Sequence, residues 1–113
     1  MGKTTAKKGK ECSLNLKSVA LLAKTLSDEN RLRILLSVSD GKKSVSRIVD
    51  ELRLSQPLVS HHLKELKLAA LVKVERKGPF VYYELADIKT RDIINQLHEL
   101  AKDLNEKKLH GKV

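Results

Sequence analysis

The spacing of apolar positions predicts four helices in the first two thirds of the chain. Apolar residues recur every three to four positions over 19–26, 32–38, 48–52 and 59–66, which is the period of a helix with one buried face. The residues Asp28, Ser44 and Ser55 each stand before one of these runs, where a side-chain oxygen can cap a first turn. We therefore expect a first helix from about residue 13, a second that ends at Asp40-Gly41, and a fourth that ends near Leu68.

The pattern changes period after residue 68. Residues 71–76 and 80–85 are rich in β-branched and aromatic side chains, and the Lys77-Gly78-Pro79 segment between them has turn chemistry. This predicts one β-hairpin, which must pack on the helices because two strands alone are marginally stable. A helical stripe returns over about 87–107. The expected fold is mainly α with a β-hairpin wing, in the order α-α-α-α-β-β-α.

The fourth predicted helix, residues 55–68, divides into two faces. At 100° per residue, Val59, Leu63 and Leu66 fall within about 60° of one another. His62 lies on the flank of this apolar face, where we expect a packed, hydrogen-bonded histidine. Polar residues at 60, 61 and 64 point away from it, so we predict that one side of the helix packs inside while the other faces outward.

Two short helices followed by a basic hairpin are the parts of a winged helix-turn-helix, whose second helix enters the major groove of DNA. Gln pairs with adenine, Ser with base edges, His with guanine or phosphate, and Lys with phosphate. The spacing alone fits equally well with ordinary solvated residues, with a capping role for Ser55, and with a solvated turn at the hairpin tip. The candidate DNA-binding residues are Ser44, Ser55, Gln56, Pro57, Ser60, His61, Lys64, Arg76 and Lys77.

The charge balance favours a polyanionic partner. The 113 residues include 23 Lys and Arg against 14 Asp and Glu, a net charge of +9. Much of the excess lies at the ends, since residues 13–106 hold 16 basic and 13 acidic residues. We expect a flexible basic arm at 1–12, one DNA-binding and dimerisation domain at 13–107, and a basic tail at 108–113. The two ends either contact DNA or only keep the protein in solution.

Other function classes find little support in the sequence. The single cysteine, Cys12, cannot form an intrachain disulfide, and no apolar run approaches the ~20 residues of a membrane span, so we expect a cytoplasmic protein without a membrane partner. A phosphate-binding Gly loop, an HExxH pattern and a His–acid partner for Cys12 are all missing, so we expect neither enzyme activity nor a cofactor. The alternative function is a winged-helix protein-interaction module without specific DNA binding, which would need an acidic or apolar outer face on 55–68.

The stretches LSDENRLRILL (26–36) and LSQPLVSHHLKELKLAALVKVERKGPFVYYEL (54–85) resemble the ArsR/SmtB family of winged-helix repressors. The resemblance implies a homodimer on double-stranded operator DNA, released by an inducer that is often a metal ion. It places Gln56, Ser60 and His61 at base-reading positions and residues 76–80 at the wing tip. A two-fold dimer predicts an inverted-repeat operator. The first and last helices would form the dimer, with candidate residues Val19, Leu22, Ile93, Ile94, Leu97, Leu100, Ala101 and Leu104.

The metal sites of the family are not matched by this chain. Where the family carries two cysteines at the start of the third helix, this sequence has Ser44 and Ser46, which excludes a thiolate site. At the start of the last helix, Lys89 replaces the expected histidine. His98 and His110 are the remaining metal candidates, and we expect His98 to be an ordinary surface or interface residue. The residues specify no inducer.

Overall fold

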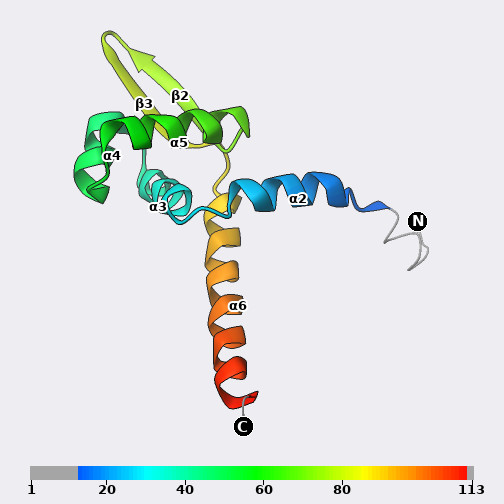
Figure 1. The fold of residues 1–113 in the computed structure, drawn as a ribbon. Coiled ribbons are helices and arrows are strands. Elements are labelled where there is room, and N and C mark those ends of the chain that lie inside the picture. Colours follow the sequence, from blue (N-terminus) through cyan, green and yellow to red (C-terminus); the bar gives the residue numbers. More distant parts are fainter. Residues whose placement is uncertain (1–12, 112–113) are drawn as a thin grey trace.

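The computed structural model describes residues 13–111, with side chains up to residue 109. Its elements follow in the order α2 (Leu16–Thr25), α3 (Glu29–Ser37), the 3-10 helix η1 (Val38–Asp40), β1 (Lys43–Ser44), α4 (Val45–Leu52), α5 (Gln56–Leu68), β2 (Val72–Lys77), β3 (Phe80–Leu85) and α6 (Lys89–Gly111). This order confirms the predicted mainly α fold with a hairpin wing (Figure 1).

Side-chain caps fix where the helices begin. Asp28 Oδ1 accepts the backbone N–H groups two and three residues later, at 2.8 and 3.1 Å. Ser44 and Ser55 each accept the N–H three residues later, at 3.2 and 3.3 Å. These N–H groups have no partner inside their own helix, so each cap stabilises its helix by about 1 kcal/mol.

The strands form one antiparallel sheet in the order β1-β3-β2. β2 and β3 make the predicted hairpin, with Lys77 opposite Phe80 at its tip and Gly78 in the left-handed region (φ 60°) that glycine adopts easily. β1 was not predicted, because a two-residue strand is too short to show alternation. It pairs with Tyr82 and Tyr83 and so ties the hairpin to the start of α4.

The core lies among α3, η1, α4 and α5 and is closed by the base of the sheet. We call residues 26–88 the head. The side chains that are less than 2% exposed all belong to it: Ile34, Leu35, Val38, Ile48, Val59, Leu63 and Leu66. Two details differ from the predicted second helix. Val38 lies in η1 because α3 ends at Ser37, and Leu36 is 38% exposed rather than packed.

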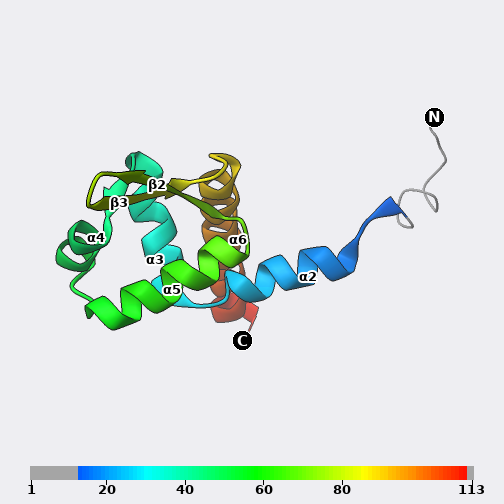
Figure 2. The same ribbon diagram turned by 90° about the horizontal axis from the view of Figure 1, so that it is seen from above.

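Helices α2 and α6, which we call the limbs, leave the head in different directions (Figures 1 and 2). α2 contains no buried residue, and only Leu26, directly after it, enters the core. α6 is rooted by Thr90 and Ile94, and residues 95–109 are exposed. The radius of gyration is 17.8 Å, against about 13 Å for a compact domain of this length. The limbs therefore stand away from the only core that the described residues form.

The last helix is longer than predicted. It continues to Gly111, so residues 108–111 extend the helix beyond the expected boundary at Lys107 instead of starting a tail. The predicted arm at 1–12, with Cys12, lies outside the described residues. Between residues 13 and 111, no helix has both the length and the apolar character needed to cross a bilayer.

Candidate nucleic-acid interface

Helix α5 presents the two faces that its sequence predicts. Val59, Leu63 and Leu66 are at most 1% exposed. The opposite side carries the exposed side chains of Gln56, Pro57, Ser60, His61 and Lys64. The polar groups of this outer side form no hydrogen bond or ion pair with another residue of the part that the structure describes. They are therefore available to a ligand that approaches the head.

The turn between α4 and α5 is held in place by contacts with α4, with the core and with α3. Arg53 ends α4 in the left-handed region (φ 57°, ψ 44°), and its N–H bonds to the Val49 carbonyl at 2.8 Å. Leu54 packs half-buried against the core. From α3, Arg33 donates to the Leu52 carbonyl at 2.8 Å. These contacts fix the end of α4 and the turn that leads into α5, the connection on which a helix-turn-helix depends.

The hairpin tip is exposed and basic, but part of its charge is already paired. The Glu75 carboxylate accepts a hydrogen bond from Lys42 and lies 3.6 Å from Lys77 Nζ. The Lys42 hydrogen bond holds the pKa of Glu75 below its ordinary value, so the carboxylate stays charged. Arg76 makes no ion pair with any residue in 13–111. Of the two residues predicted to contact DNA from the wing, Arg76 therefore keeps its full charge for a ligand, whereas the charge of Lys77 is partly neutralised by Glu75.

Two of the candidate DNA-binding residues act as helix caps. Ser55 holds the first turn of α5, which agrees with the capping role considered for it, and Ser44 does the same for α4. Ser44 Oγ also lies 3.3 Å from Ser46 Oγ. Both caps stand at helix N-termini, whose free N–H groups favour phosphate. Their positions are set by the fold whether or not they contact DNA.

A family profile described as "Bacterial regulatory protein, arsR family" matches residues 28–74, which run from α3 into β2. The transcriptional repressor SdpR of Bacillus subtilis is 38% identical over 72 residues, which are 64% of this chain and 80% of SdpR. The chain belongs to the ArsR family. It is accordingly a DNA-binding transcriptional regulator and not an enzyme.

Solved structures extend the ArsR-family likeness to most of the chain. The transcriptional activator HlyU of Vibrio cholerae is 31% identical over 96 residues, 85% of this chain and 89% of HlyU. Reduced HlyU covers 80% of this chain and 95% of its own, with a TM-score of 0.69 and 32% identity. The homodimeric winged helix-turn-helix DNA-binding domain Mb0332 of Mycobacterium bovis covers 95% of this chain and 92% of its own, with a TM-score of 0.61 and 25% identity.

The ArsR-family cysteine positions do not fit a metal ion here. Ser44 and Ser46 offer neutral hydroxyls, which are poor ligands compared with thiolates, and Ser44 is already engaged as a cap. Across residues 13–111, no three His, Cys, Asp or Glu side chains gather in a group that would hold a metal. His98 is exposed on α6, and the side chain of His110 lies outside the described part.

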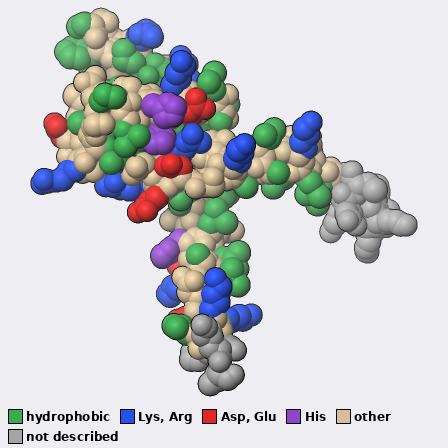
Figure 3. All heavy atoms as spheres, viewed as in Figure 1, with side chains coloured by type: hydrophobic (Ala, Val, Ile, Leu, Met, Phe, Trp, Pro, Cys, Tyr) green, Lys and Arg blue, Asp and Glu red, His purple; other side chains and the backbone are tan. Residues whose placement is uncertain are grey.

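The limbs carry the residues predicted for an ArsR-type dimer. Figure 3 shows apolar side chains along both of them. Seven of the eight candidates are exposed: Val19, Leu22, Ile93, Leu97, Leu100, Ala101 and Leu104. Ile94 is the exception and corrects the prediction, because it is 7% exposed and belongs to the core of the head. Leu16 and Leu21, which the sequence analysis did not single out, are also exposed on α2, at 59% and 60%.

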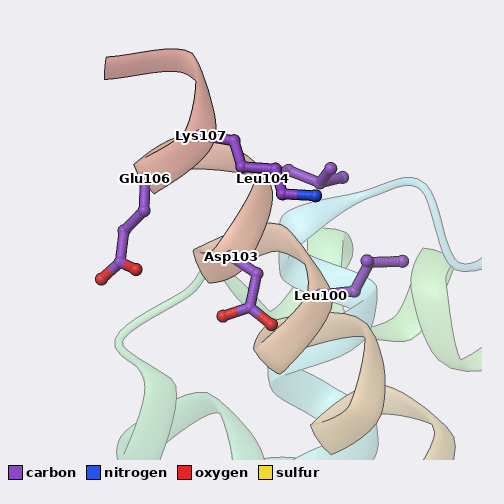
Figure 4. A pocket seen from close by; sticks show the side chains of 5 residues that line it. All are labelled: Leu100, Asp103, Leu104, Glu106 and Lys107. Atoms are coloured by element: carbon purple, nitrogen blue, oxygen red, sulfur yellow. The ribbon is translucent and has the colours of Figure 1, made fainter. Parts of the chain in front are cut away.

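The exposed stripe of α6 includes an open hollow. Leu100 and Leu104 point to the same side of the helix as Lys107, whereas Glu106 points to the other side (Figure 4). Asp103 completes the lining. Because all these residues come from one helix, the hollow has no opposite wall within the described chain.

His62 is buried where α3 packs against α5. It is 5% exposed, as predicted for a histidine on the flank of the apolar face. Arg31 Nε donates to its Nδ1 at 3.3 Å, which requires Nδ1 to be the accepting, unprotonated nitrogen. Burial lowers the pKa of His62. Sequence reasoning did not find Arg31, because it lies 31 residues away and no local pattern relates the two.

Proposed function

We propose that the chain is a homodimeric repressor that binds an inverted-repeat operator through α5 of each protomer. The observation that carries this proposal is the outer side of α5, where Gln56, Ser60 and His61 are exposed and make no hydrogen bond or ion pair with another described residue. Gln reads adenine and Ser reads base edges, at about 1–3 kcal/mol of discrimination for each good contact. Lys64 and Arg76 supply charge for the phosphates on either side.

The limbs support the homodimer. Their exposed leucines form a stripe that water solvates poorly, and a second copy of the chain covers it by the same residues on both sides. Mb0332, whose structure resembles 95% of the present chain, is homodimeric. The similarity to SdpR, a repressor, supports repression, although HlyU, another similar protein, is an activator. We place the protein in the cytoplasm, where it would meet its operator.

The first test measures binding to random duplex DNA over a salt series, followed by selection of bound sequences from a random pool. Affinity is expected to fall steeply with salt, with a slope of about −0.9 for every phosphate neutralised. The selected sequences are expected to contain two inverted half-sites. A flat salt response would instead favour a protein-interaction module. A reporter gene under the selected operator is expected to lose expression when the protein is present, and an increase would make the protein an activator.

The second test changes the reading face. The double variant Gln56→Ala with Ser60→Ala is expected to lose operator preference by about 1–3 kcal/mol per contact while it keeps its affinity for random DNA. Lys64→Ala is the matched variant on the same face, and it is expected to weaken both kinds of binding equally and to lower the salt slope by about one. Equal losses of specific and random binding in the double variant would show that α5 reads the bases with other residues.

A further inference from the structure

We propose that Arg31, held by Asp28 and His62, is a positioning residue that fixes the angle between limb α2 and helix α5, and so sets the half-site spacing that the protein accepts. This inference rests on the proposed homodimer and its inverted-repeat operator. It assigns a role in DNA recognition to three residues outside the proposed base-reading set, one of which, His62, lies with its ring centroid 5.4 Å from that of His61.

Limb α2 is attached to the head by few contacts. None of its residues is buried, and its apolar side chains Leu16, Val19 and Leu21 are all more than half exposed. Leu26, 8% exposed, is the single side chain at its end that enters the core. One apolar contact leaves a helix free to pivot, so the direction of α2 depends on polar contacts at the same end.

Arg31 makes the polar contact between α2 and α5. Its Nη1 donates to the carbonyl of Thr25, the last residue of α2, at 3.3 Å. Its Nε donates to His62 Nδ1, on α5, at 3.3 Å. Both donors belong to one planar, rigid guanidinium. A movement of the end of α2 relative to His62 therefore lengthens at least one of the two hydrogen bonds.

Asp28 contacts both Arg31 and His62 and helps to hold them in place. Its Oδ1 accepts the backbone N–H of Arg31 at 3.1 Å and lies 3.7 Å from His62 Nε2. The imidazole is thus flanked by the guanidinium on one ring nitrogen and by the carboxylate on the other, at a position where it is 5% exposed. These contacts restrict the orientation of the His62 ring. Because the ring is attached to α5, they also restrict rotation of α5 about its own axis.

The angle between α2 and α5 matters because the limbs define the two-fold axis of the proposed dimer. The position of each α5 relative to its own limb then determines how far apart the two reading faces stand. Successive base pairs are 3.4 Å apart along the duplex, and half-sites must match the spacing of the two helices. A small change of angle at the junction therefore moves the reading face toward a different spacer length.

The test uses the full chain and a library of operators that share the selected half-site and differ in spacer length. Arg31→Lys keeps the charge but loses the rigid pair of donors, and His62→Leu removes the acceptor on α5 while keeping a buried apolar side chain. Glu29→Gln is the control, because Glu29 lies on the same helix, is exposed, and makes no hydrogen bond or ion pair with another described residue. Sedimentation confirms that each variant is folded and dimeric.

We expect the wild-type chain and Glu29→Gln to prefer one spacer. In Arg31→Lys and His62→Leu, that preference is expected to fall by a factor of about five to ten, the size of one hydrogen bond, while half-site sequence preference stays unchanged. If either variant folds as a dimer and keeps the wild-type spacer preference, the positioning role is wrong and the homodimeric operator complex stands. If the wild-type chain itself shows no spacer preference, the inverted-repeat proposal fails and this inference fails with it.

Discussion

The head and the limbs are built from the same kinds of residue and end in different environments. Both contain amphipathic helices rich in Leu, Ile and Val. In the head, the stripes of α3, α4 and α5 meet one another and, together with η1, leave seven side chains less than 2% exposed. On the limbs, the stripe of α6 carries Leu97, Leu100 and Leu104 at 47–53% exposure. Hydrophobic spacing thus identifies a helix that needs a neighbour, but it does not say whether that neighbour belongs to the same chain.

The contrast predicts two kinds of stability. The head is stabilised by contacts within one chain, so its stability does not depend on protein concentration. In the proposed homodimer a second copy stabilises the limbs, so their contribution grows with concentration. Substitutions in the two regions should therefore be distinguishable by how their effects change with dilution.

Leu97→Asp should give the largest effect. It places a charge on the apolar stripe of α6, and the symmetry of a dimer places two of them in the interface. We expect the dimer dissociation constant to rise at least about a hundredfold, since an unpaired charge in an interface costs about 2–5 kcal/mol. Sedimentation equilibrium measures this change. Glu99→Ala, on the opposite side of the same helix, is the control, and a Leu97→Asp variant as dimeric as wild type would exclude this stripe as the interface.

Leu35→Ala should give the next effect, on the head. Leu35 is 0% exposed, so the truncation leaves a cavity and is expected to lower the free energy of unfolding by about 2–5 kcal/mol. The same truncation at Leu104, made in the monomeric Leu97→Asp background, is expected to cost less than about 0.5 kcal/mol because the side chain is already exposed. Urea denaturation measures both, and similar losses at the two leucines would contradict the division into head and limbs.

A pH effect at His62 should be the smallest of the three. Burial lowers the pKa of His62 from 6.5, so between the lowered value and 6.5 the unfolded chain binds a proton that the folded chain does not. Stability is therefore complete above pH 6.5 and falls as the pH falls through this window. The pKa of Asp28 is also lowered, first by the hydrogen bond from the N–H of Arg31, but its loss of stability begins only near its ordinary value of 3.8.

Urea denaturation at pH 7.5, 6.5 and 5.5 measures the His62 effect. His62→Leu is expected to flatten the dependence of stability on pH in this range, and His98→Gln, at an exposed position on α6, is expected to leave it unchanged. An identical pH dependence in wild type and His62→Leu would mean that another group titrates in this window.

The sequence predicts best where local spacing and burial coincide. α5 is the clearest case, because Val59, Leu63 and Leu66 define one side and polar or charged residues occupy positions 56, 60, 61 and 64 on the other. Ile93 and Ile94 show the limit: they are neighbours in one predicted stripe, yet Ile94 packs into the head while Ile93 is 43% exposed. The contact between Arg31 and His62 was beyond prediction for a related reason, since it depends on how two helices cross.

If the proposed homodimer forms, its exposed apolar limbs also link the lifetime of each molecule to its abundance. At low copy number, dissociated subunits present Leu16, Leu21 and the α6 leucines to chaperones and proteases, which act on such surfaces. At higher copy number, mass action covers the same side chains and degradation slows. Degradation would then remove dissociated subunits first, so that the protein would have a shorter half-life at low concentration than at high concentration.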